Sequence, residues 1–202
     1  MTRLLLVVPM IIVLTTSCGG SGKKAAMACA IGGDPSKAEL AKLESGKTYK
    51  GTVRTNKGTF TIEFATTTSP CTTASFIGLA QKGFFDGTIF HRIVPGFVIQ
   101  GGDPTGTGSG GPGYTTVDVP PADTKYEKGL VAMAKTGNEP SGTSGSQFFV
   151  VTGDAVGLPP DYAVLGKVVD GLDVVEKIGR LGDAHEHPTE RVEIQEIKIA
   201  SS

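Results

Sequence analysis

The sequence predicts a mainly β fold, an antiparallel barrel or sandwich that carries two helices. Short apolar stretches recur along the chain with turn residues between them, and 29 glycines among 202 residues favour turns and short strands. Two stretches have the periodicity and flanking residues of a helix. The formal net charge of −1 gives no electrostatic reason to expect a nucleic acid or an anionic membrane surface as partner.

The first expected elements are a hairpin and a helix. Residues 49–55 and 59–64 alternate apolar and polar side chains on either side of the turn Asn56-Lys57-Gly58, which predicts two paired strands with one buried face. A helix then begins with Ser69 as N-cap and Pro70 at its first position, and Gly83 ends it.

The rest of the domain alternates strands with loops and one short helix. Strands are expected at residues 88–93, 97–100, 129–134, 148–152 and 163–169, a helix at 172–178, and a last strand at 192–199. In the last strand the apolar phase slips by one residue between Ile194 and Ile197. This slip predicts a β-bulge near Gln195-Glu196.

The N-terminus has the pattern of an export signal. Arg3 precedes the apolar run Leu4 to Leu14, which is too short to span a bilayer and has the length of a signal-peptide core. The following Thr15-Thr16-Ser17-Cys18 resembles the lipobox of bacterial lipoproteins, in which the cysteine is lipidated after cleavage. We therefore expect a signal peptide at residues 1–17 and a lipidated Cys18. Ordinary secretion and a buried core helix at Leu4 to Leu14 are the alternatives.

A small and polar stretch separates this signal from the domain. Residues 18–46 are interpreted as a tether, with a short helix after Asp34 as N-cap and Pro35 at its first position. Once Cys18 is lipidated, Cys29 and Cys71 are an even pair in an oxidising compartment. They either form a disulfide between tether and domain or remain two thiols, and two cysteines are too few for a structural zinc site.

Two further motifs do not predict the chemistry that they suggest. Residues 106–111 satisfy the glycine pattern of a dinucleotide site, but Pro112-Gly113 follows where a phosphate-binding helix should begin, which indicates a surface loop. His185-Glu186-His187 alternates two possible metal ligands before a proline, without a third ligand. We expect neither a cofactor nor a metal.

Two stretches carry a resemblance to a known family. Residues 90–103 read F-H-R-I-V-P-G-F-V-I-Q-G-G-D, and residues 145–150 read G-S-Q-F-F-V. Together they resemble the signature of the cyclophilins, the peptidyl-prolyl cis/trans isomerases that cyclosporin inhibits. The resemblance implies a cyclophilin-like eight-stranded antiparallel barrel closed by two helices over residues 47–200, with no cofactor or metal.

The same resemblance assigns roles to nine residues. It makes Arg92 the catalytic arginine and gives Gln100 the task of holding the substrate backbone. The implied substrate-binding residues are Phe97, Val98, Phe149 and Leu158 around the proline ring, Ala134 and Lys135 through their backbones, and Tyr162 at the edge of the pocket. Proline-containing peptides and unfolded exported proteins are the implied partners, and a monomer is expected.

Three positions depart from the common family pattern. Lys135 replaces the usual Asn, and the loop at residues 136–145 that follows it is longer by a few residues. Val98 replaces the frequent Met in the same apolar role, and Gly157 stands where cyclosporin-sensitive members have Trp. We therefore expect weak cyclosporin binding. A non-catalytic peptide-binding or holdase module, and an adhesion or structural lipoprotein, are the alternative functions on the same fold.

Overall fold

A computed structural model of the protein describes residues 28–202. The signal peptide expected at residues 1–17 and the lipidation expected at Cys18 lie outside the described residues. None of the helices within residues 28–202 combines the length and the apolar character needed to cross a membrane.

The main sheet has eight antiparallel strands in the order β11-β2-β3-β10-β7-β9-β5-β4. Its strands are β2 (Tyr49–Thr55), β3 (Gly58–Phe64), β4 (Arg92–Val94), β5 (Val98–Gly101), β7 (Leu130–Met133), β9 (Phe148–Val151), β10 (Val164–Asp170) and β11 (Ile194–Ser201). The predicted mainly β fold, with eight antiparallel strands, is confirmed.

The two edges of this sheet come together, so that the sheet curls on itself. Ile194 exchanges backbone hydrogen bonds with residues 87 and 88, and the Phe90 N–H donates to the Val192 carbonyl at 3.0 Å. Ile89 forms single bridges to Asp103 and to Glu193. The chain changes partners at this residue, and for this reason the expected strand 88–93 is regular only at its end, in β4.

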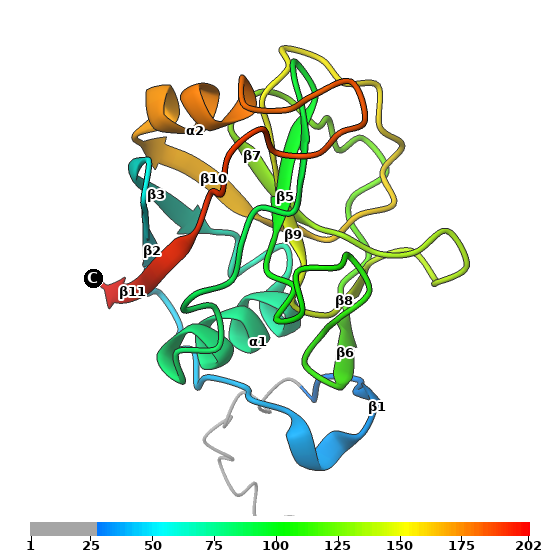
Figure 1. The fold of residues 1–202 in the computed structure, drawn as a ribbon. Helices are drawn as coiled ribbons and strands as arrows, with labels where there is room; N and C mark the ends of the chain where they lie inside the picture. The colour runs from blue at the N-terminus through cyan, green and yellow to red at the C-terminus, as the bar shows by residue number, and fades with distance from the viewer. Residues whose placement is uncertain (1–27) are drawn as a thin grey trace, which may run out of the picture.

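Within the described residues, two α-helices cover the open ends of the curled sheet (Figure 1). α1 (Pro70–Gln81) is buried along most of its length, and Gly83 follows it with φ +70, the left-handed conformation expected after a helix. α2 (Leu172–Gly179) lies across the other end and buries Val175 and Ile178.

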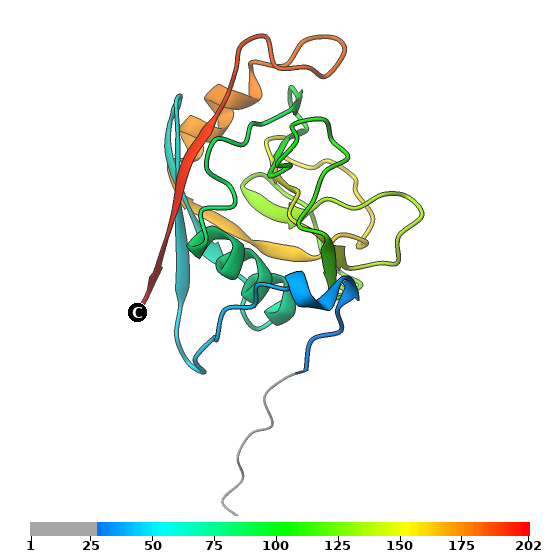
Figure 2. The same ribbon diagram turned by 60° about the horizontal axis from the view of Figure 1, so that its bottom comes forward.

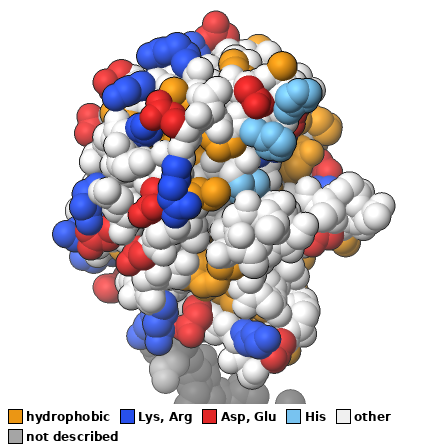
Figure 3. Space-filling model, in the orientation of Figure 1, with side chains coloured by type: hydrophobic (Ala, Val, Ile, Leu, Met, Phe, Trp, Pro, Cys, Tyr) orange, Lys and Arg blue, Asp and Glu red, His pale blue; other side chains and the backbone are white. Residues whose placement is uncertain are grey.

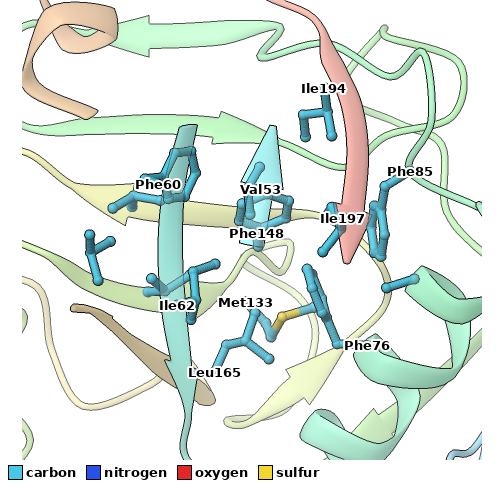
Figure 4. Packing of buried hydrophobic residues seen from close by; sticks show 14 of the residues in the cluster. Val53, Phe60, Ile62, Phe76, Phe85, Met133, Phe148, Leu165, Ile194 and Ile197 are labelled. Carbon is cyan, nitrogen blue, oxygen red and sulfur yellow. The ribbon is translucent and has the colours of Figure 1, made fainter. Parts of the chain in front are cut away.

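The interior is an apolar core with many aromatic rings (Figure 4). Phe76 of α1 stacks on Phe85 with ring centroids 4.5 Å apart and meets the edge of Phe148 of β9 at 5.4 Å. Val53, Phe60 and Ile62 reach the same core from the hairpin β2–β3, and each is fully buried. The alternation predicted for the hairpin places these side chains inside.

The expected tether is structured in its described part. From residue 28 the chain runs along α1, as the blue segment of Figure 2 shows, and Cys29 and Cys71 form a disulfide with Cα atoms 5.5 Å apart. The short helix expected after Asp34 is present as the 3-10 turn η1 (Pro35–Lys37). The Ala41 N–H donates to the Ala74 carbonyl of α1 at 2.9 Å. Residues 28–46 therefore pack against the domain.

The extension also completes a second, small sheet. β1 (Gly32–Gly33), β6 (Tyr114–Val117) and β8 (Thr143–Ser144) pair in the order β1-β6-β8. The hydroxyl of Tyr114 lies within hydrogen-bonding distance of Ser75 on α1 and accepts from the Glu39 N–H. No sequence pattern predicted this sheet, whereas the bulge expected near Gln195-Glu196 is present as a register shift between Ile194 and Glu196.

Candidate functional site

The hairpin β4–β5 places Arg92 directly opposite Gln100. A turn over Pro95 and Gly96 joins the strands, with Gly96 at φ +70 and the Phe97 N–H donating to the Val94 carbonyl at 3.0 Å. On the next strand, β9, Phe149 pairs with Gln100. Because paired residues of antiparallel strands point to the same face, Arg92, Gln100 and Phe149 emerge side by side.

Two side chains hold the guanidinium of Arg92. Its Nη1 donates to Gln100 Oε1 over a long 3.4 Å, and its Nε donates to the carboxylate of Glu186 at 2.6 Å. The Arg92 side chain is 34% exposed, so the remaining N–H groups of a permanently charged donor can reach a ligand.

Gln100 belongs to a chain of hydrogen-bonded amide side chains that ends on the glycine-rich loop at residues 106–111. Its Nε2 donates to Gln147 Oε1 at 3.0 Å, and Gln147 Nε2 donates to the carbonyls of Gly108 and Gly110 at 3.0 and 2.9 Å. This chain fixes the orientation of the Gln100 amide, because its Oε1 accepts from Arg92 and its Nε2 donates to Gln147.

Asp103 organises the glycine-rich loop at residues 106–111. Its fully buried carboxylate accepts hydrogen bonds from the backbone N–H groups of Thr105, Thr107, Gly108 and Gly110. Burial raises the pKa of Asp103, but the hydrogen bonds from Gly110, Thr105 and Gly108 outweigh it and hold the pKa at about 2. The N–H groups that a phosphate would need are thus occupied by the protein's own carboxylate.

An apolar cluster lies beside the polar groups. Phe149 and Val98 are almost fully buried at its base, while Phe97, Leu158 and Tyr162 are half-buried around them. The rings of Phe149 and Tyr162 meet edge to face with centroids 5.5 Å apart. The structure thus brings together the residues that the resemblance assigns to a proline pocket, with Val98 and Phe149 as base and the others as wall.

Tyr126 fixes the position of Tyr162. Its hydroxyl donates to the Tyr162 carbonyl at 2.6 Å and accepts from the Tyr162 N–H at 3.0 Å. Its ring also contacts Phe149 and Tyr162 at centroid distances of 6.4 and 6.0 Å. Tyr126 therefore supports the apolar cluster from below, although nothing in the sequence pattern around it indicated this role.

A groove of about 550 Å³ continues from the polar edge of the cluster. Its walls include Gln100, Gln147, Ala134 and Lys135, together with the glycine-rich loop and Gly33 of the extension. The Ala134 N–H already donates to the Gln147 carbonyl at 2.9 Å. The groove therefore offers a mixed surface, with glycine backbone and the amides of Gln100 and Gln147 on one part and the side chains of Tyr114 and Glu139 on another.

The side chain of Lys135 points away from the groove into the protein. It is only 4% exposed, and its Nζ lies 2.6 Å from Asp161, 3.1 Å from the Glu139 carbonyl and 5.6 Å from the ring centroid of Tyr162. The hydrogen bond from Lys135 lowers the pKa of Asp161. At this position, which is usually Asn in the family, the lysine joins the loop at residues 136–139 to the wall of the apolar cluster.

Several residues of the site were not expected from the sequence. Gln147 is visible in the sequence only as part of the family motif, and Glu186 only as the residue between two histidines that were considered as metal ligands. In Figure 3, which has the orientation of Figure 1, histidine side chains lie close to acidic and hydrophobic side chains.

The described residues hold no evident metal site. Within residues 28–202, no group of three or more His, Cys, Asp and Glu side chains is arranged to bind a metal ion.

The fold and this constellation define a class of protein: a curled antiparallel sheet that presents an arginine and a glutamine beside an apolar cluster. Residues 51–199 match the family model of the cyclophilin type peptidyl-prolyl cis-trans isomerases. The chain is 39% identical over 172 residues to peptidyl-prolyl cis-trans isomerase A of Mycobacterium tuberculosis, covering 76% of this chain and 93% of that protein. It is 40% identical over 149 residues to a peptidyl-prolyl cis-trans isomerase of Helicobacter pylori, covering 72% and 90%.

The solved structures agree with the sequence comparison. A crystal structure of a cyclophilin type isomerase from Cryptosporidium parvum has a TM-score of 0.69 and 31% identity, covering 77% of this chain and 99% of that chain. A second structure of that protein, obtained in the presence of the dipeptide Ala-Pro, has a TM-score of 0.68. The chain therefore belongs to the cyclophilin family of peptidyl-prolyl cis-trans isomerases.

Proposed function

We propose that the protein catalyses cis/trans isomerisation of X-Pro bonds in exported proteins and so assists their folding. The observation that carries this function is the pairing of Arg92 and Gln100 beside an apolar cluster that includes Phe149. The X-Pro bond needs such help, because its rotation barrier is about 18–20 kcal/mol and its isomers exchange over tens to hundreds of seconds.

The catalyst must bind the twisted amide better than either planar form. In the twisted state resonance is lost and the prolyl nitrogen regains a lone pair that can accept a hydrogen bond. The N–H groups of Arg92 that Glu186 and Gln100 leave free supply this donor, while Phe97, Phe149, Leu158 and Tyr162 hold the ring. No covalent bond forms and no proton is transferred.

The arginine cannot account for the whole acceleration. A rate increase of about 10⁵-fold requires roughly 7 kcal/mol of transition-state stabilisation. One charge-assisted hydrogen bond contributes about 1.5–3 kcal/mol. The rest must come from clamping the ring and from orienting the carbonyl through Gln100, whose amide is already fixed by Gln147.

Location outside the cytoplasm is the second part of the proposal. Its supports are the apolar run Leu4 to Leu14, the cysteine at position 18, and the Cys29–Cys71 disulfide, since disulfides persist in oxidising compartments. We propose that the signal is cleaved before Cys18, that lipid on Cys18 anchors the protein at the outer face of the bacterial cytoplasmic membrane, and that the enzyme acts there as a monomer.

A labelling experiment tests the anchor. The full chain is expressed in a bacterium fed with a tagged fatty acid, beside Cys18→Ala and, as a matched cysteine control, Cys29→Ala. We expect the label in the membrane fraction for the wild type and for Cys29→Ala, and none for Cys18→Ala. Label that persists in Cys18→Ala, or unprocessed wild-type protein in the cytoplasm, would contradict the proposed location.

A further inference from the structure

Glu186 lies in the loop between α2 and β11 and contacts the arginine of the site. Its carboxylate accepts a hydrogen bond from Arg92 Nε at 2.6 Å, across 94 positions of sequence. We propose that Glu186 is a positioning residue, which sets the orientation of the Arg92 guanidinium for catalysis. This inference rests on the catalytic role proposed above for Arg92.

The loop that carries Glu186 is tied both to itself and to β4. The Ile93 N–H, next to Arg92, donates to the Glu186 carbonyl at 2.9 Å. Asp183 Oδ1 accepts from the N–H groups of His185 and His187 at 2.8 and 2.9 Å, and these bonds lower the pKa of Asp183. The backbone at Glu186 is therefore fixed relative to the strand that carries Arg92.

The backbone conformation of Glu186 is unfavourable for a residue with a side chain. Among residues 28–202 it is the one non-glycine with a positive φ, at 67°. Glycine adopts this conformation without strain. The ion pair is partly exposed, at 34% for Arg92 and 48% for Glu186, and exposed pairs contribute little to stability. Stability therefore does not account for a glutamate here, whereas contact with Arg92 does.

The contact with Glu186 restrains the Arg92 guanidinium at Nε, an atom that Gln100 does not contact. Gln100 holds Nη1 at 3.4 Å, a long hydrogen bond that leaves the plane of the group free to rotate. Glu186 holds Nε, on a different edge, so that the two contacts together define the plane. The remaining N–H groups on Nη1 and Nη2 are then held at fixed directions within that plane, so that one of them can be presented to a prolyl nitrogen.

Replacing Glu186 by glycine separates positioning from stability. Glu186→Gly removes the carboxylate and relieves the backbone, so its thermal midpoint should equal or exceed that of the wild type. We expect kcat to fall about tenfold, with KM changed less than about twofold, because the charge of Arg92 remains but its orientation is lost. Glu186→Gln should also lower kcat. The control is Glu190→Gln. Glu190 lies in the same loop as Glu186 but pairs with Lys57 of the β2–β3 turn, so this change should leave kcat unchanged.

A spectroscopic signature of Arg92 completes the test. In the wild type, the ¹H–¹⁵N resonance of Arg92 Nε should be protected from solvent exchange, and this protection should be lost in Glu186→Gly but kept in Glu190→Gln. The inference is overturned if the wild type catalyses and Glu186→Gly retains its full kcat, or if the Nε resonance does not change. A wild type without catalysis would instead overturn the proposed function, while the Nε resonance would still test the contact.

Discussion

Removal of the Cys29–Cys71 disulfide should destabilise the protein by about 4 kcal/mol. The bond closes a loop with a sequence separation of 42 residues. Loop-closure entropy for a loop of this length corresponds to about 13 cal/mol/K, or about 4 kcal/mol at 25 °C. Since domains of this kind unfold with about 5–15 kcal/mol, the bond supplies a substantial part of the total.

The folded state of the double variant Cys29→Ser/Cys71→Ser should remain close to that of the wild type. The extension has other contacts with the domain, such as the Ala41–Ala74 hydrogen bond and the burial of Ile31 and Leu43 against the core. The effect therefore comes mainly from the greater freedom of the unfolded chain.

Urea unfolding followed by circular dichroism measures the effect, since the chain has no tryptophan for fluorescence. With a slope of about 2 kcal/mol/M, the midpoint should fall by about 2 M. Wild-type protein under reducing conditions should have the same midpoint as the double variant. A fall of less than about 0.5 M, or less than about 1 kcal/mol, would refute the loop-entropy reasoning.

Three further predictions concern the site and its surroundings. Asp103→Asn should lower the free energy of unfolding, measured with urea, by about 2–3 kcal/mol, because its amide NH₂ would face backbone N–H donors. The control Asp123→Asn, at an exposed position, should leave the free energy of unfolding unchanged, and equal decreases in the two variants would contradict this reasoning. Burial lowers the pKa of His91 below its ordinary value of 6.5, the nearby Asp103 charge opposes this shift, and the Arg92 charge adds to it. Below pH 6.5 the unfolded chain therefore binds more protons at His91 than the folded protein does. The free energy of unfolding should therefore decrease from pH 7 toward pH 5, and His91→Phe should flatten this slope; an unchanged slope would assign it to other groups. Cyclosporin should bind weakly, because Gly157, at φ +65 in open space, offers it no ring; nanomolar affinity in a competition assay would reject this.

Local patterns in the sequence predicted much of the fold. The hairpin at residues 49–64, α1 and the bulge after Ile194 follow from periodicity, from capping residues and from a phase slip, each visible within about ten residues. β1, β6 and β8 have only two to four residues, too few to show a period. Their pairing depends on distant contacts, among them the disulfide and the Tyr114 hydroxyl.

The site was predictable to the extent that it is local. Arg92 and Gln100 face each other because a tight turn joins their strands, which the Pro-Gly pair indicates. Glu186 reaches Arg92 from the far end of the chain, and Tyr126 reaches Tyr162 across 36 residues. No sequence period records such contacts, nor the contact between the inward-turned side chain of Lys135 and Asp161.

The most direct test of the central claim is cis/trans exchange of an X-Pro peptide, followed by NMR. The disulfide-bonded protein from residue 28 onward, the part that the structure describes as folded, is compared with Arg92→Ala. The account predicts exchange well above the uncatalysed rate for the wild type and a decrease of at least about tenfold for Arg92→Ala, at similar peptide affinity. Exchange at the uncatalysed rate with peptide still bound would contradict it, and would identify the protein as a non-catalytic peptide-binding module on the cyclophilin fold.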